Sequence, residues 1–166
     1  MIKEEKEMEQ KSLARWLKFI IIGVAICGAL IYFCIIPECG RTMVNAYPEF
    51  SFRYWPWLIF LWITAIPCYG VLIFGWQIAT NIGKDKSFSM ENAKALKWIS
   101  WLAIVDTIFF FVINVVYLFL DLSHPGVVLL SLIVVFAGVA VSVAAAALSH
   151  LVQKAAVLQE QSDLTI

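Results

Sequence analysis

Charged side chains are scarce in this sequence, and the two signs balance. Only 14% of the residues are Asp, Glu, Lys or Arg, against roughly 25% in a soluble domain. The 12 basic and 12 acidic residues leave a formal net charge of zero, which excludes the broad basic field of a protein that binds nucleic acid directly. The shortage of charge indicates that much of the folded surface does not face water.

The chain also lacks the motifs of the common enzyme classes. Its four cysteines contain no Cys-x-x-Cys pair, which a membrane thiol oxidoreductase needs because disulfide exchange requires two neighbouring thiols. Cys27 and Cys34 are expected to be small apolar residues of one helix, and a disulfide between Cys34 and Cys39 stays an alternative. No group of residues indicates a metal or a cofactor. We therefore expect no enzymatic activity.

Four long apolar runs fill most of the chain, at residues 17–36, 57–79, 99–119 and 126–148. Each is long enough to cross ~30 Å of hydrocarbon at 1.5 Å per residue. They predict an all-α fold, a four-transmembrane-helix bundle in the lipid bilayer that forms one domain over residues 1–166. We expect the first run to be a retained span, because it is too long and follows too acidic a segment for a cleaved signal peptide.

The distribution of Lys and Arg predicts the orientation. Five lie in the N-terminal segment 1–18, four lie in the loop 80–98 and one, Lys154, lies in the tail 149–166. Only Arg41 and Arg53 lie on the other side. Because basic residues stay in the cytoplasm, this split places both termini there, in a protein of the bacterial cytoplasmic membrane.

The connections between the runs differ in character. Residues 37–56 are expected to form an outer loop over the bundle mouth, and residues 121–126 a tight outer turn. On the cytoplasmic side, Ser89 is a good N-cap for a helix that leads into the third span. The tail is expected to continue the fourth helix and to pack against the inner loop, because both carry apolar residues that a lone helix would leave wet.

Polar residues inside the spans are the candidate functional residues. Asp106 is the only acid or base well inside a span, so it is a functional candidate by default. Counting depth places it level with Tyr69 and Ser142, and places Asn114 level with Thr64 and Ser131. Interhelical hydrogen bonding explains these residues most simply, in which case Asp106→Leu would destabilise the bundle. Proton or ion transfer, and the sensing of a ligand or signal, stay open for Asp106.

The fourth run carries small residues at every fourth position: Gly138, Ser142 and Ala146. Such a face lets helix backbones approach closely. Packing within the bundle is the simpler use, and a homodimer seam through these residues is the alternative.

Two stretches are distinctive, FSMENAKALK at residues 88–97 and LQEQSDLTI at residues 158–166. They resemble an uncharacterised family of small bacterial four-helix membrane proteins, which is known only as a domain of unknown function. Members are often encoded beside a small helix-turn-helix transcription regulator, so the resemblance implies a cytoplasmic partner of that kind. The family supplies no catalytic residues.

Three functions follow in order of preference. The first is a non-enzymatic membrane protein that senses a membrane signal or binds a cytoplasmic transcription regulator. The second is a small transporter or channel component that uses Asp106, and the third is the thiol oxidoreductase. The surface expected to meet the partner consists of Phe88, Ser89, Glu91, Asn92, Leu96, Leu158, Asp163, Leu164 and Ile166.

Overall fold

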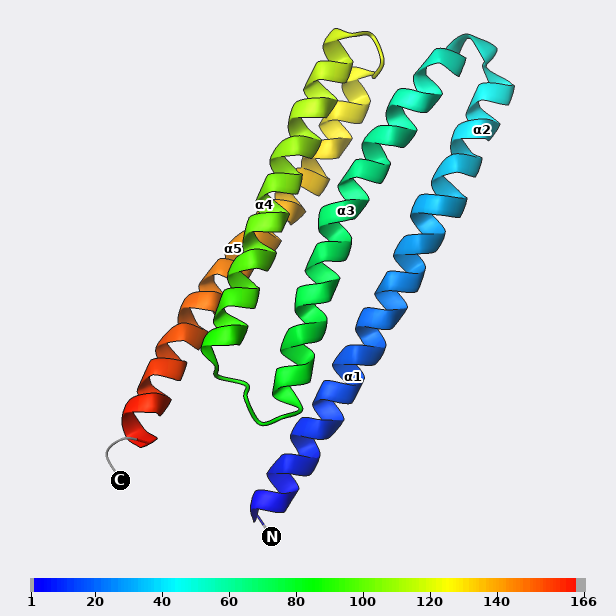
Figure 1. Cartoon of the computed structure of the whole chain (residues 1–166). Helices are drawn as coiled ribbons and strands as arrows, with labels where there is room; N and C mark the ends of the chain where they lie inside the picture. The colour runs from blue at the N-terminus through cyan, green and yellow to red at the C-terminus, as the bar shows by residue number, and fades with distance from the viewer. Residues whose placement is uncertain (1, 164–166) are drawn as a thin grey trace.

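Four long helical stretches run up and down the molecule (Figure 1). The computed structural model describes the backbone of residues 2–163 and the side chains of residues 8–162. Within that range every regular element is helical, as the sequence predicts. The elements are α1 (Ile2–Leu30), the π-helix η1 (Ile31–Ile35), α2 (Ile36–Ala46), the 3₁₀-helix η2 (Pro48–Phe50), α3 (Ser51–Ile82), α4 (Met90–Phe119) and α5 (Pro125–Asp163).

Each of the four stretches is long and apolar enough to cross a membrane, and the described spans are Met8–Ala46, Pro48–Ile82, Met90–Phe119 and Pro125–Ser162. Their large apolar side chains point outward. Ile66 is 71% exposed, Ile73 70% and Phe136 76%, as expected for apolar side chains that face the hydrocarbon of a lipid bilayer. Within the described residues, the all-helical fold with four helices long and apolar enough to span a membrane is therefore confirmed.

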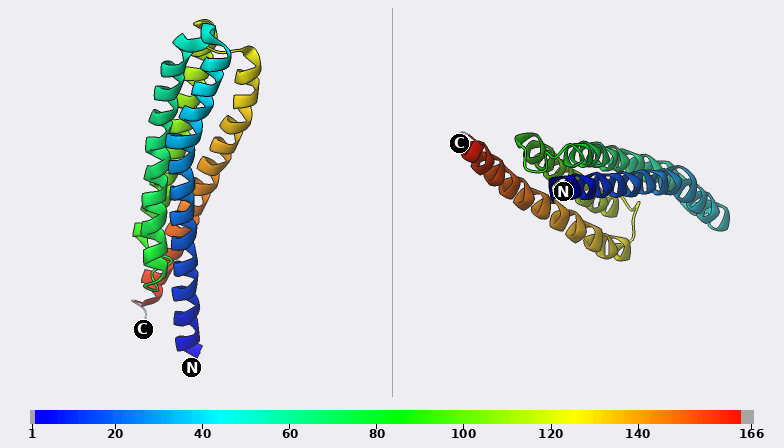
Figure 2. Two further views of the ribbon diagram at one scale, coloured as in Figure 1. Left: turned by 90° about the vertical axis from the view of Figure 1, so that its right-hand side faces the viewer. Right: turned by 90° about the horizontal axis from the view of Figure 1, so that it is seen from below.

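The helices pack in the order α1, α3, α4, α5. Within the described residues α5 contacts α4 and no other helix, and α1 does not reach it. Figure 2 shows why: α5 runs obliquely across the other three helices. The two described ends of the chain lie at the same end of the bundle (Figure 1).

The connection after the first span is helical, where the sequence analysis expected a loop at residues 37–56. α1 continues through η1 into α2, and α3 already begins at Ser51. Pro37 does not stop the helix because it lies just after η1, where Ile36 N–H already bonds to the carbonyl oxygen of Ile31, five residues earlier, in place of the regular α-helical partner. The π-helix before it is the kind of adjustment that a helix makes next to such an irregularity.

The inner loop is fastened by Asn92, which is 2% exposed. Its Nδ2 donates to the carbonyl oxygens of Lys86 and Ser87, and its Oδ1 accepts from Nδ2 of Asn81 at 2.8 Å. Ser89 caps α4 as predicted, because its Oγ accepts from the backbone N–H of Asn92. The prediction that Asn92 belongs to an accessible partner surface is wrong, because its side chain is buried and its amide group is hydrogen-bonded to Lys86, Ser87 and Asn81.

The inner loop and the C-terminal part of α5 do come together. Ser149 Oγ donates to the carbonyl oxygen of Ala93 at 2.7 Å. Further along α5, a groove of about 310 Å³ lies between the loop and the helix. The predicted packing is confirmed for the described residues, whereas Leu164, Ile166 and the side chain of Asp163 lie outside them. The groove is lined by Asp85, Lys86, Phe88, Ser89, Ala156, Gln159 and Glu160.

Small residues build the contact between α4 and α5. Ser142 Oγ donates to the carbonyl oxygen of Ser100 at 2.9 Å, and a Cβ at Gly138 would overlap Thr107 Oγ1. α4 therefore covers the face considered for a second copy, which agrees with packing inside the bundle; dimerisation itself stays a prediction. The buried positions of α5 are Ser131, Ser142, Ala145, Ser149 and Ala156.

We expect Gly138→Ala to lower the free energy of unfolding by about 1–3 kcal/mol, because the added methyl group overlaps Thr107 in a close-packed seam. Thr107→Ala in the same chain should restore much of the loss. Gly23→Ala is the matched control, since a Cβ there meets nothing within 4 Å. Denaturation of the purified protein in detergent compares all three variants with the wild-type protein. Equal stabilities of Gly138→Ala and Gly23→Ala would contradict the tight seam.

Candidate functional site

A pocket of about 410 Å³ lies halfway along the spans, in the space between η1 and α5. It exists because these two elements do not touch. This midplane pocket has a size typical of small-molecule sites. Its polar lining residues are Tyr32, Thr64, Cys68, Asp106 and Thr107, and its apolar lining residues are Leu61, Pro67, Val71, Leu102, Ala103, Phe110, Val134, Val135, Ala137, Gly138 and Val141.

Asp106 lies inside the bundle and has one weak partner there. Cys68 Sγ donates to its Oδ2 at 3.8 Å, which is a long contact from a weak donor. The other carboxyl oxygen, Oδ1, is buried and has no hydrogen-bond partner. A buried polar atom without a partner costs free energy, so this carboxyl group is available to an occupant of the pocket.

Tyr69 and Ser142, the two neighbours that depth counting predicted for Asp106, are bonded elsewhere. Tyr69 OH donates to the carbonyl oxygen of Ala25 at 2.8 Å, on the α1 side of α3. The predicted depth differs from the observed one by a single residue, since Cys68 rather than Tyr69 contacts Asp106. Because each residue turns a helix by about 100°, Cys68 faces α4 and Tyr69 does not. Ser142 is level with Ser100, because α4 and α5 are offset along their axes. The predicted partners are wrong for these two reasons.

Asn114, Thr64 and Ser131 are buried, but each bonds its own helix. Asn114 is 0% exposed, and its Nδ2 donates to the carbonyl oxygen of Phe110. Thr64 and Ser131 donate to the carbonyl oxygens three residues earlier. Such local bonds do not join helices, so Asn114 and Ser131 are not interhelical bridges, and Oδ1 of Asn114 is buried without a hydrogen-bond partner. Of the three, Thr64 alone lines the midplane pocket.

Tyr32 is the pocket residue that sequence reasoning missed most clearly. It lies in η1, next to Thr64 and Cys68, and its carbonyl oxygen accepts from Trp62 Nε1 at 3.0 Å. A π-turn shifts the register of the side chains that follow, and such turns are frequent at functional sites. Nothing in the sequence marks this turn except the proline that soon follows it. Cys68 and Thr107 were missed because only the fold shows that they share a pocket with Asp106.

The chemistry available in the midplane pocket is binding chemistry. Hydroxyl, thiol and carboxyl groups lie on one side of an otherwise apolar space. All four cysteines are free, so the alternative disulfide between Cys34 and Cys39 is not formed. Among the described side chains, no three His, Cys, Asp or Glu residues gather as metal ligands. The arrangement suits a small ligand with hydrogen-bonding groups.

The weak contact of Asp106 reverses the stability expectation for its removal. Asp106→Leu should change the free energy of unfolding by less than about 1 kcal/mol, because it loses one poor hydrogen bond and relieves an unpaired buried oxygen. Ser142→Val is the positive control, since it breaks the bonds to Ser100 and overfills the seam. Denaturation in detergent compares the two. A loss for Asp106→Leu as large as that for Ser142→Val would make the carboxyl group structural.

Comparison with known proteins places the chain among membrane proteins. It is 29% identical over 149 residues to "Uncharacterized membrane protein YoaS" of Bacillus subtilis (strain 168), which covers 89% of this chain and 92% of the relative. No solved structure matches the fold. Residues 38–166 match the family model described as "Protein of unknown function (DUF2975)". This match covers more than half of the chain, from Glu38 in α2 onward, so the protein belongs to the DUF2975 family of unknown function.

Proposed function

We propose that this protein is a non-enzymatic component of the bacterial cytoplasmic membrane that responds to a signal in the midplane pocket and holds a cytoplasmic transcription regulator. Both termini, the inner loop and the end of α5 lie in the cytoplasm in this proposal. The regulator is of the helix-turn-helix class that the family resemblance implies.

The observation that carries the proposal is the fixed but uncovered surface at the inner end. Asn92 in α4 holds the inner loop by donating to its backbone carbonyl oxygens. The carbonyl oxygen of the next residue, Ala93, accepts from Ser149 in α5. Phe88, which lines the groove, is 59% exposed, and Leu158, which lies next to Gln159 on α5, is 65% exposed. Apolar side chains that stand in water on a fixed surface are typical of protein interaction sites. Ser89 also lines the groove, and Glu91 and Leu96 follow it in the first two turns of α4.

The midplane pocket and the inner surface share one helix. α5 lines the pocket from Val134 to Val141 and lines the groove through Ala156, Gln159 and Glu160. Because α5 packs against α4 alone, an occupant of the pocket can shift it without breaking contacts with α1 or α3. Small shifts of a packed helix are a common way to couple two sites. This continuity supports a link between ligand binding and partner binding.

The orientation has a direct test. Because ten of the 12 Lys and Arg residues lie on the side of the termini, a reporter fused after Ile166 should be cytoplasmic. A reporter inserted at Asn45 in α2, or at Ser123 in the second outer turn, should be on the opposite side. Alkaline phosphatase and green fluorescent protein fusions measure the two outcomes. Phosphatase activity at Ile166 would contradict the proposed topology.

Partner binding is tested by the double variant Phe88→Ser and Leu158→Ser. Burial of each apolar side chain by the regulator would contribute about 1.5–3 kcal/mol, so the pair should weaken binding at least tenfold. The measurement is the affinity of a purified helix-turn-helix regulator, encoded beside the gene of this protein, for the full-length protein in nanodiscs.

Leu13→Ser is the matched control for that experiment. Leu13 is 54% exposed on the cytoplasmic part of α1, away from the groove and from α5. It should leave the affinity unchanged. An equal loss in both variants, or no binding by the wild-type protein, would contradict the proposed surface.

A small transporter is the second candidate, and Asp106 is the observation that favours it. Its side chain lines the midplane pocket and also a second hollow between α3 and α4, bounded by Ile66 and Phe74. A carboxyl group that borders two spaces is suited to passing a proton or cation. Asp106→Asn separates the candidates, because it would abolish transport into proteoliposomes but leave binding of the regulator intact.

A further inference from the structure

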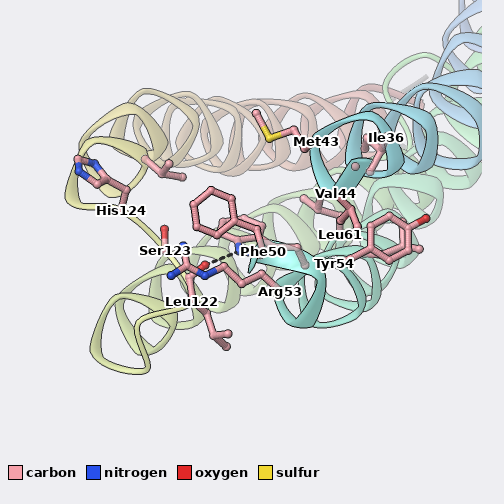
Figure 3. Close-up of a pocket in the computed structure, with 14 residues that line it drawn as sticks. Ile36, Met43, Val44, Phe50, Arg53, Tyr54, Leu61, Leu122, Ser123 and His124 are labelled. Atoms are coloured by element: carbon pink, nitrogen blue, oxygen red, sulfur yellow. Dashed lines mark hydrogen bonds between the residues drawn. The ribbon is translucent and has the colours of Figure 1, made fainter. Parts of the chain in front are cut away.

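A second pocket of about 410 Å³ lies at the other end of the bundle from the two termini (Figure 3). We call it the outer pocket. α2, α3 and the turn before α5 enclose it, and Trp57 Nε1 holds that turn by donating to the carbonyl oxygen of Leu122 at 2.9 Å. Its apolar lining residues include Ile36, Val44, Leu58, Leu61 and Val127.

Arg53 reaches into the outer pocket without a partner for its charge. Its Nε is buried and has no hydrogen-bond acceptor, and no described carboxylate forms an ion pair with it. The guanidinium group lies 4.7 Å from the ring centre of Phe50 and 5.2 Å from that of Phe52, which hold it in place. In Figure 3 the side chain extends toward the turn that carries Ser123.

Ser123 is a second unsatisfied group in the same pocket. Its Oγ is buried and has no hydrogen-bond partner. A buried donor without an acceptor is costly, and two such donors on one pocket wall are satisfied together by one oxyanion. Guanidinium groups bind carboxylate and phosphate oxygens in preference to other anions.

We infer that the outer pocket binds an anionic amphiphile, with its carboxylate or phosphate head at Arg53 and Ser123 and its hydrocarbon chain along Val44, Leu58 and Leu61. A free inorganic anion does not explain the apolar remainder of the pocket. Of the 14 residues that line it, Arg53 alone carries a full charge, so one oxyanion head is matched by one cation. Both a bilayer lipid and a free fatty acid have this chemistry.

The test is native mass spectrometry of the full-length protein in a neutral detergent. Phosphatidylglycerol, laurate, phosphatidylcholine and inorganic phosphate are titrated separately. Saturable binding of one molecule of phosphatidylglycerol or laurate per chain is expected, and which of the two binds identifies the source. Arg53→Gln should weaken this binding about tenfold or more, because the head loses its charged donor.

Two further variants distinguish binding in the outer pocket from nonspecific electrostatic attraction of the anionic ligand to the protein. Arg41→Gln removes the same charge from the same end of the bundle at an exposed residue outside the outer pocket, so binding should persist. Val44→Phe fills the space proposed for the chain while keeping Arg53, and it should abolish binding of the amphiphile. Equal loss from Arg41→Gln and Arg53→Gln, equal binding of phosphatidylcholine, competition by inorganic phosphate alone, or no saturable binding would each overturn the inference.

Discussion

The contact between α4 and α5 is the interaction on which the rest of the structure depends. In lipid there is no hydrophobic force to press two apolar helices together, so close packing and interhelical hydrogen bonds must hold them. Gly138 brings the backbones together at Thr107, and Ser142 and Ser149 bond directly to α4. Because α5 has no other helix neighbour, this seam alone positions it.

The seam also determines where the polar groups are left. α5 packs along α4 and does not approach α1. The midplane pocket therefore lies between η1, which continues α1, on one side and α5 on the other. Asp106 borders that space with one oxygen unpaired, whereas Asn114, which also has an unpaired oxygen, and Ser131 lie outside the pocket and donate to carbonyl oxygens of their own helices. A polar residue in a span is therefore informative only when its local bonds have been accounted for.

The two halves of the α3–α4 contact are built differently. Toward the outer end, Phe60 is 2% exposed and packs its ring against Phe110 and Tyr117. Toward the inner end, the amides of Asn81 and Asn92 replace this aromatic packing. The aromatic end supports the wall of the outer pocket through Trp57, and the amide end fastens the loop beside the groove between that loop and α5.

The sequence by itself determined the four spans, the helix start at Ser89 and the packing of the inner loop against the tail. These depend on apolar run length, on a local cap and on the need to cover apolar residues, all of which are read along one chain. Only the tertiary structure decided that Cys68 rather than Tyr69 faces Asp106, that Asn92 is buried, and that Arg53 enters a pocket. The reason is that a helix turns by about 100° per residue, so depth predicts the level of a side chain but packing decides the direction in which it points.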